Sequence, residues 1–305
     1  MSSQPTPGAV PTISFEFFPP ASPEMAYKLW GSAMALGPLG PRFVSVTYGA
    51  GGTTRRRTLD AIKALRGNAQ LTVAGHLTCV GATKEETIAV AQEYKEAGVQ
   101  RIVALRGDPP KNEDGSQGVF QPHPGGFEGA VDLVEALVSE VGLPVAVGAY
   151  PEPHPQAADP ADDVTHLKRK LDAGADVAIT QFFFDNEDYY RFRDKCAAAG
   201  VDKPILPGML PIERFDRMVK FAGACGANVP QCLHDLYAKA DTPDAAQALS
   251  IDLCVAQCRD LLERGGLDHL HFYTLNSPTL TMAVCEALGV KTDATATPQP
   301  IAAAG

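Results

Sequence analysis

The chain has 305 residues, a net charge of −10 at pH 7 and 45% hydrophobic residues, which suffices for a large buried core. The acidic balance argues against a nucleic-acid partner, because phosphate backbones bind to concentrated basic surfaces. No apolar run approaches the ~20 residues of a membrane helix, and residues 1–11 lack the features of a signal peptide. Seven cysteines without framework spacing indicate reduced thiols, so we expect a cytoplasmic protein that binds neither nucleic acid nor membranes.

Short β-rich runs alternate with amphipathic segments along the chain. Helix starts are indicated by the N-cap Ser22 before Pro23, by a capping box from Thr83 to Glu86, and by Asp185. The predicted strands are 13–18, 43–47, 71–77, 101–105, 145–149, 177–181, 205–206 and 270–274.

Apolar strands that alternate with helices predict a parallel sheet, and eight repeats favour closure into a barrel. We therefore predict an α/β fold, a single (β/α)8 TIM barrel over residues 12–290. The stretch 211–268 is long enough to hold extra helices before the last strand. The ends, 1–11 and 291–305, are rich in Pro, Ala and Thr and are predicted to be flexible tails.

In such a barrel the active site lies at the carboxyl ends of the strands. Strand alternation puts Glu16 on the face opposite Phe15 and Phe17, so Glu16 points into the barrel mouth if the aromatics face the helices. Burial there would raise the pKa of the carboxyl, which suits a general acid. A buried glutamate paired with an arginine is an equally good interpretation of this position.

Asp108 follows the strand 101–105 and enters a loop stiffened by Pro109 and Pro110. A strand-end acid is often a turn or capping residue, but here the next helix is expected well after the two prolines. Gly107 would let a flat ligand approach the backbone closely. The position is therefore a second candidate for the active site.

Other strand ends exclude several kinds of chemistry. The glycine-rich segment 49–54 has Thr54 where a dinucleotide-binding fingerprint needs glycine, so we reject a Rossmann site. Gln181 occupies the place where a Schiff-base aldolase carries lysine, and no clustered His and Asp set indicates a metal site. The aromatic run 182–184 is expected to pack between barrel and helices, and His76 alone is as readily a core histidine as a ligand.

Eight motifs, most of them at strand ends, follow one another in a fixed order. They are SFEFFPP at 14–20, VSVTYG at 44–49, HLTC at 76–79, ALRGD at 104–108, YPEPHP at 150–155, LKRK at 167–170, ITQFFFD at 179–185 and HFYTLN at 271–276. Together they resemble the methylenetetrahydrofolate reductase family, in its bacterial form that consists of the catalytic domain only. One such motif would be weak evidence, whereas eight in register from about residue 13 to residue 290 are specific.

The resemblance implies a barrel that holds FAD and works by a ping-pong reaction. NAD(P)H reduces the flavin and leaves, and 5,10-methylenetetrahydrofolate then takes the hydride to become 5-methyltetrahydrofolate, which feeds one-carbon metabolism and methionine synthesis. Glu16 matches the family's general acid, and Asp108 matches a carboxylate that stabilises the folate iminium cation. Gln181 matches a pterin contact, Phe221 an aromatic that stacks on either substrate, and Thr47 a further substrate contact.

The resemblance also assigns a set of side chains to FAD. Arg106 and Lys170 would offset the pyrophosphate charge, and Tyr150 and His154 would lie at the adenosine end. The positions carried over are Thr47, His76, Leu105, Arg106, Gly107, Asp108, Tyr150, His154, Asp163 and Lys170.

Three positions depart from the family's pattern. Gly129 replaces a common tyrosine and removes one flavin contact, and the segment 111–124 is longer than in short bacterial forms. Ser277 stands where the family usually has arginine, so the choice between NADH and NADPH stays open. Two alternatives also stay open, namely a barrel that binds folate or nucleotide without redox chemistry and a flavin-free barrel lyase or transferase. Family members commonly self-associate, so a homo-oligomer is open as well.

Overall fold

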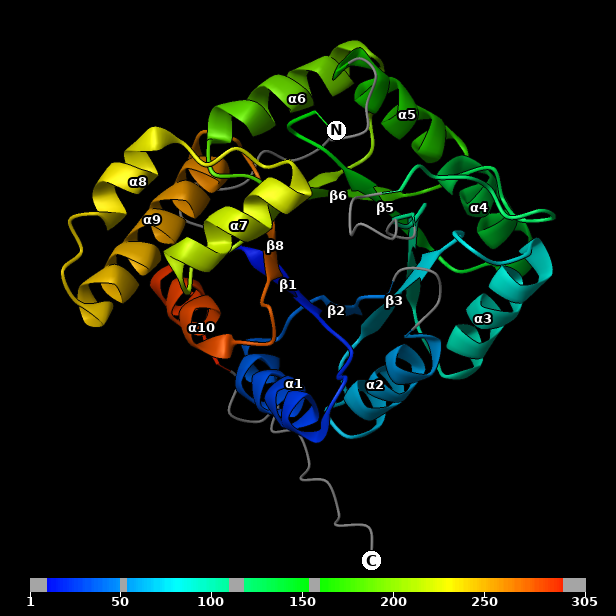
Figure 1. Cartoon of the computed structure of the whole chain (residues 1–305), viewed down its shortest axis with the longest axis horizontal. Coiled ribbons are helices and arrows are strands. Elements are labelled where there is room, and N and C mark those ends of the chain that lie inside the picture. Colours follow the sequence, from blue (N-terminus) through cyan, green and yellow to red (C-terminus); the bar gives the residue numbers. More distant parts are fainter. Residues whose placement is uncertain (1–9, 50–53, 110–117, 154–159, 293–305) are drawn as a thin grey trace, which may run out of the picture.

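Eight parallel strands form a closed barrel in which each strand pairs with its neighbours in chain order and β1 pairs with β8 (Figure 1). The computed structural model describes residues 10–49, 54–109, 118–153 and 160–292. The strands are β1 (Thr12–Phe17), β2 (Phe43–Val46), β3 (Val73–Thr78), β4 (Arg101–Leu105), β5 (Val145–Ala149), β6 (Val177–Phe182), β7 (Ile205–Met209) and β8 (His269–Tyr273). The predicted (β/α)8 barrel is confirmed.

Helices surround the barrel on its outer face (Figure 1). They are α1 (Pro23–Leu36) with the 3₁₀ turn η1 (Gly37–Leu39), α2 (Arg55–Gly67), α3 (Lys84–Glu96), α4 (Ala130–Ala136) with the π-helical η3 (Leu137–Val141), α5 (Pro160–Asp172), α6 (Asn186–Ala198), α7 (Phe215–Cys225), α8 (Gln231–Tyr237), α9 (Pro243–Glu263) and α10 (Pro278–Ala287). The predicted extra helices before the last strand are present, because α8 and α9 follow α7 ahead of β8.

The predicted helix starts are confirmed by their hydrogen bonds. The Ser22 hydroxyl accepts from the backbone N–H of Met25, and Thr83 and Glu86 form a reciprocal capping box. The Asp185 carboxylate accepts from the backbone N–H of Glu187 at the start of α6. These caps fix where each helix begins, and therefore the length of the loop that leads to it from the preceding strand.

Two apolar layers hold the barrel. Phe15 and Phe17 of β1 are fully buried on the outer face among the helices, as the strand alternation predicts. Inside, small and branched side chains from neighbouring strands form a separate cluster. Its buried members are Ala74, Val103, Ala146 and Ile179. Polar side chains of β1 and β8, namely Ser14, His269 and His271, are buried in the interior as well, so the barrel is a filled core.

The strand β7 continues to Met209, past the predicted end at residue 206. The prediction was too short because Pro207 and Gly208 interrupt the apolar pattern in the sequence. The glycine is required by packing: a Cβ at Gly208 would lie 2.3 Å from the Thr180 carbonyl oxygen and 2.5 Å from the Tyr273 ring. The close approach lets β7 continue to Met209 beside β6 and β8.

Parts of the predicted tails, 1–9 and 293–305, lie outside the described residues. Within the described part of the chain, no helix is long and apolar enough to cross a membrane. The same residues hold no group of three or more His, Cys, Asp or Glu side chains arranged for a metal ion.

Candidate active site

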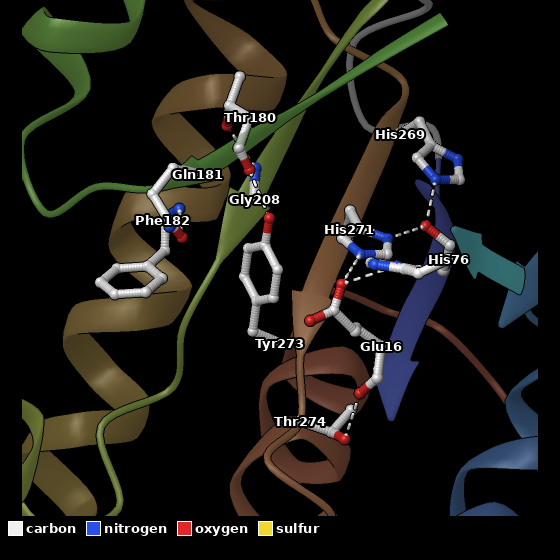
Figure 2. Close-up of polar contacts among 11 residues, drawn as sticks. Glu16, His76, Thr180, Gln181, Phe182, Gly208, His269, His271, Tyr273 and Thr274 are labelled. Carbon is white, nitrogen blue, oxygen red and sulfur yellow. Dashed lines mark hydrogen bonds and ion pairs between the residues drawn. The ribbon is translucent and has the colours of Figure 1, made fainter. Parts of the chain in front are cut away.

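Titratable side chains from three strands meet at the mouth of the barrel. Glu16 comes from β1, His76 from β3, and His271 and Tyr273 from β8 (Figure 2). Glu16 pairs in register with Tyr273, and β8 becomes a neighbour of β1 only through closure of the barrel. Glu16 therefore points into the mouth, as the sequence predicts.

Two imidazoles hold the Glu16 carboxylate. The Nε2 atom of His76 lies 3.2 Å from Glu16 Oε2, and the Nε2 atom of His271 lies 3.9 Å from the same oxygen. Burial acts to raise the pKa of Glu16, but the charges and hydrogen bonds of His76 and His271 prevail and lower it to about 2. The expected rise is therefore wrong, and two histidines stand where the alternative interpretation expects an arginine.

Hydrogen bonds continue from His271 into the barrel. Its Nδ1 atom lies 2.7 Å from the Ser14 hydroxyl, which is also 2.8 Å from Nε2 of His269. Nδ1 of His269 lies 2.7 Å from the Thr12 hydroxyl. Burial, His271 and Arg42 lower the pKa of His269 to about 3, so this ring is neutral at ordinary pH.

On the other side of Tyr273 from Glu16 lies β6, which the Tyr273 side chain reaches from β8 (Figure 2). The Tyr273 hydroxyl donates to the Thr180 carbonyl at 2.6 Å, and burial raises the pKa of this phenol, so it stays neutral. The Gln181 side-chain oxygen accepts from the backbone N–H of Phe182 at 3.0 Å. This contact orients the amide and leaves its NH₂ group as the donor that Gln181 can offer to a ligand.

An aromatic pair lies at the end of β6. Phe182 is buried and stacks on Phe221 of α7 with 5.4 Å between ring centroids, while Phe221 itself is 37% exposed. Phe183 stacks on Tyr189 at 5.5 Å, so the predicted packing role of the aromatic run is confirmed there. The exposed side of Phe221 is suited to stacking on a planar ligand.

The predicted cofactor residues of β4, β5 and α5 form one electrostatic neighbourhood. Asp108, Arg106 and Asp163 act on the Tyr150 phenol, whose pKa is raised to about 12, chiefly by burial. Asp163 also acts on Lys170, which is buried and donates to the Gly148 carbonyl at 2.5 Å. Burial lowers the pKa of Lys170 to about 8, so an anion next to its ammonium group would stabilise the charged form.

The remaining predicted positions flank this neighbourhood. Gly107 has a φ of +88° and would place a Cβ 2.6 Å from Val80 and 2.8 Å from Thr78, so glycine is required there. The backbone N–H of Thr47 donates to the Phe17 carbonyl at the end of β2. Leu105 is half-buried against the interior cluster of the barrel. His154 lies outside the described residues.

This donor set fits FAD on its own chemistry. Arg106 and the buried Lys170 supply positive charge for a pyrophosphate, and the buried Thr78 hydroxyl has no hydrogen-bond partner among the described residues. Arg106 lies over the Phe120 ring at 4.9 Å, which orients the guanidinium group. Gly129 is the N-cap of α4, and a Cβ there would meet no described atom within 4 Å, so the position admits a residue larger than glycine.

Sequence reasoning missed Ser14, His269, His271 and Tyr273 as functional residues. A signal was available, because His269, His271 and Tyr273 alternate along one strand and so share one face. What the sequence alone lacked was the pairing of β8 with β1, which puts that face against Ser14 and Glu16.

The fold and the site together define an enzyme of the (β/α)8-barrel class, with an acid, imidazoles and a phenol at the strand ends. Residues 3–289 match the family model described as methylenetetrahydrofolate reductase. The chain belongs to the methylenetetrahydrofolate reductase family.

Several relatives carry the family's name. The 5,10-methylenetetrahydrofolate reductase of Pectobacterium carotovorum is 43% identical over 283 residues, which cover 92% of this chain and 91% of the relative. The Escherichia coli protein of the same name is 41% identical, with the same coverage. Methylenetetrahydrofolate reductase (NADH) 1 of Arabidopsis thaliana is 33% identical, and the match covers 91% of this chain but 48% of the plant protein.

A solved structure supports the fold. It is an uncharacterized protein from Clostridium thermocellum, described as binding two copies of 5-methyl-5,6,7,8-tetrahydrofolic acid. It superposes with a TM-score of 0.59 at 14% identity and covers 91% of this chain and 93% of its own. At this identity the likeness concerns the barrel alone.

Proposed function

We propose that this protein is a cytoplasmic flavoenzyme that reduces 5,10-methylenetetrahydrofolate to 5-methyltetrahydrofolate, with NAD(P)H as electron donor. The observation that carries the proposal is the Glu16 carboxyl, which is held by His76 and His271 at the mouth of a barrel of this family. The relatives from Pectobacterium carotovorum and Escherichia coli, 43% and 41% identical and named 5,10-methylenetetrahydrofolate reductase, support the substrate class.

FAD, when bound, would accept a hydride from the nicotinamide and pass it to the folate. Arg106, Lys170 and Asp163 would hold its polar end, with Tyr150 beside them and Gly107 allowing close approach to the backbone. Thr47, His76, Leu105 and Asp108 join the proposed set from the ends of β2, β3 and β4, and His154, which lies outside the described residues, completes it.

Glu16 acts on the folate. Opening the five-membered ring of the substrate requires a proton on the nitrogen that leaves, and a carboxyl at the barrel mouth can deliver it. His76 and His271 are the groups from which the carboxyl can regain a proton, since each has its Nε2 atom facing Glu16 Oε2. The carboxyl and the imidazoles beside it are coupled, so the transferable proton belongs to the group as a whole and not to Glu16 alone.

Asp108 supplies negative charge from the other side of the mouth. Ring opening leaves an iminium cation on the folate, and a fixed carboxylate stabilises such a cation more strongly where water is excluded. Asp108 is exposed and acts on Tyr150 and on Cys225 of α7. Bound ligands would cover it and strengthen its effect.

The pterin and the nicotinamide would share the wall made by Gln181 and Phe221. The Gln181 NH₂ group would donate to a pterin acceptor, and the exposed side of Phe221 would stack on whichever ring is bound. One stacking position used in turn by two ligands is consistent with a ping-pong reaction.

The test is spectroscopic. Purified protein should be yellow, its flavin absorbance should bleach with NADH under anaerobic conditions, and 5,10-methylenetetrahydrofolate should restore the absorbance. A colourless protein that FAD does not reconstitute would contradict the redox proposal and favour a folate-binding barrel or a flavin-free lyase or transferase.

A further inference from the structure

Two strands bring hydroxyls and imidazoles face to face below Glu16. Thr12 pairs in register with His269, and Ser14 pairs with His271. Because side chains alternate along a strand, these residues share the inner face of the barrel with Glu16. The result is a continuous series, Thr12–His269–Ser14–His271, that ends at the Glu16 carboxyl (Figure 2 shows His269, His271 and Glu16).

We assign the direction of the first bonds from the lower end of the series. The Thr12 hydroxyl donates to the Asp268 carbonyl at 3.0 Å, and a carbonyl oxygen can only accept. The 2.7 Å contact between Thr12 and Nδ1 of His269 therefore needs the ring to donate. His269 is neutral because its pKa is lowered to about 3, so its Nε2 atom carries a lone pair.

The next bonds follow from the first. Nε2 of His269 accepts from the Ser14 hydroxyl at 2.8 Å, which uses the single proton of Ser14. The 2.7 Å contact between Ser14 and Nδ1 of His271 then needs His271 to donate. In a neutral His271 ring, Nε2 is left as a lone pair 3.9 Å from Glu16 Oε2, with no other hydrogen-bond partner among the described residues.

We infer that this hydrogen-bond series fixes the tautomer of His271 and thereby obliges the Glu16–His271 pair to hold one proton. With the opposite tautomer, Nε2–H of a neutral ring would satisfy a Glu16 carboxylate and the pair would hold no transferable proton. Ser14 and His269 are on this account positioning residues for the proton that Glu16 delivers. The functional part of the inference rests on the proposed role of Glu16.

The proton balance is simple. The proton passes from the pair, through the Glu16 carboxyl, to the leaving nitrogen of the folate, so an O–H bond breaks and an N–H bond forms. The pair is left as carboxylate and neutral imidazole, and one proton from solvent restores it.

Few other groups act on the pair. Among the described residues, His76 of β3 faces Glu16 at 3.2 Å, and the neutral Tyr273 phenol of β8 is affected by Glu16. His269 also acts electrostatically with His271, and Arg42 acts on His269. Phe43 of β2 stacks on both His269 and His271, with 6.1 and 5.8 Å between ring centroids.

The tautomer can be measured directly by ¹⁵N NMR of protein labelled at histidine. Nδ1 of His271 should be protonated in the native protein. His269→Leu removes the acceptor for Ser14, whose hydroxyl then turns to donate to Nδ1 of His271, so the proton should move to Nε2. His269→Glu keeps a group that can only accept, with Arg42 as a counter-charge, and should preserve Nδ1–H.

The functional readout is the pH dependence of flavin reoxidation by 5,10-methylenetetrahydrofolate. His269→Leu should lower the apparent pKa of this step by about one unit and slow it about tenfold at neutral pH, because the proton-holding tautomer is lost. His269→Glu should leave that pKa unchanged or raise it, since its charge favours a proton on the pair. Flavin reduction by NADH should change in neither variant.

Opposite outcomes overturn the inference. An unprotonated Nδ1 on His271 in the native protein contradicts the series, and this measurement needs neither flavin nor folate. An unchanged pH profile in His269→Leu, or equal loss of both half-reactions, would make the series structural while the proposed function stands. If His269→Leu does not fold, Ser14→Ala takes its place. It breaks the series at the next bond and should give the results expected for His269→Leu.

Discussion

Glu16 shows how opposed effects decide the state of a single side chain. Burial alone would favour the neutral acid, but two imidazoles within 4 Å favour the carboxylate and lower its pKa to about 2. The proton donor that the proposed reaction needs is therefore not Glu16 alone. It is the Glu16–His271 pair, with His76 beside it.

Replacing Glu16 with glutamine separates the two half-reactions. Gln fills the same space but cannot donate a proton to the leaving nitrogen, so folate reduction should fall by about 10³-fold while flavin reduction by NADH stays nearly unchanged. Stopped-flow absorbance of the flavin measures both steps. Equal loss of the two would show that Glu16 only supports the structure.

Asp108→Asn tests the second carboxylate. It removes the charge proposed to stabilise the iminium cation and keeps the shape, so the folate step should slow at least about 10-fold and more than the nicotinamide step. The same stopped-flow comparison decides the order, and a larger effect on the nicotinamide step would refute this role.

At the scale of elements, the strands were predictable where local pattern decides them. Period-two alternation and apolar runs predict β1, β4 and β5 to within a residue, and capping residues predict the starts of α3 and α6. The end of β7 was not predictable, because Gly208 serves a contact with Thr180 and Tyr273 that lie far away in the sequence.

The start of α4 offers a gain-of-function test. Gly129 has an extended φ of 175°, which any residue adopts, and open space where its Cβ would lie. Gly129→Tyr should therefore fold normally and lower the dissociation constant for FAD by restoring an aromatic contact, as measured by flavin titration. Gly129→Ala is the matched control and should leave the affinity unchanged. If the Tyr variant binds FAD no better than the Ala variant, the lost tyrosine has no bearing on the cofactor.

At the scale of the molecule, the polar interior of the barrel makes stability depend on pH. The pKa values of Glu16 and His269, about 2 and about 3 when folded, lie below their ordinary values of 4.5 and 6.5. The unfolded chain then binds more protons than the folded protein. Each group therefore contributes to the free energy of unfolding at pH values above its ordinary pKa, and this contribution is lost as the pH falls. The free energy of unfolding should decrease below about pH 6.5 through His269 and further below about pH 4.5 through Glu16.

Urea unfolding of the flavin-free protein across this range measures the effect. His269→Leu lacks the first titrating group, so its stability should fall less steeply between about pH 6.5 and 4.5. An equally steep decline in this variant would assign the loss to other groups.

The sequence by itself determined the repeated strand–helix order, the inward direction of Glu16 and the family to which the chain belongs. These follow from local alternation, capping residues and motifs, which short stretches of chain carry. The tertiary structure alone decided which groups surround Glu16 and the direction of its pKa shift. Barrel closure brings Ser14 against His271 across a separation of 257 residues, and electrostatic interactions depend on distance in space.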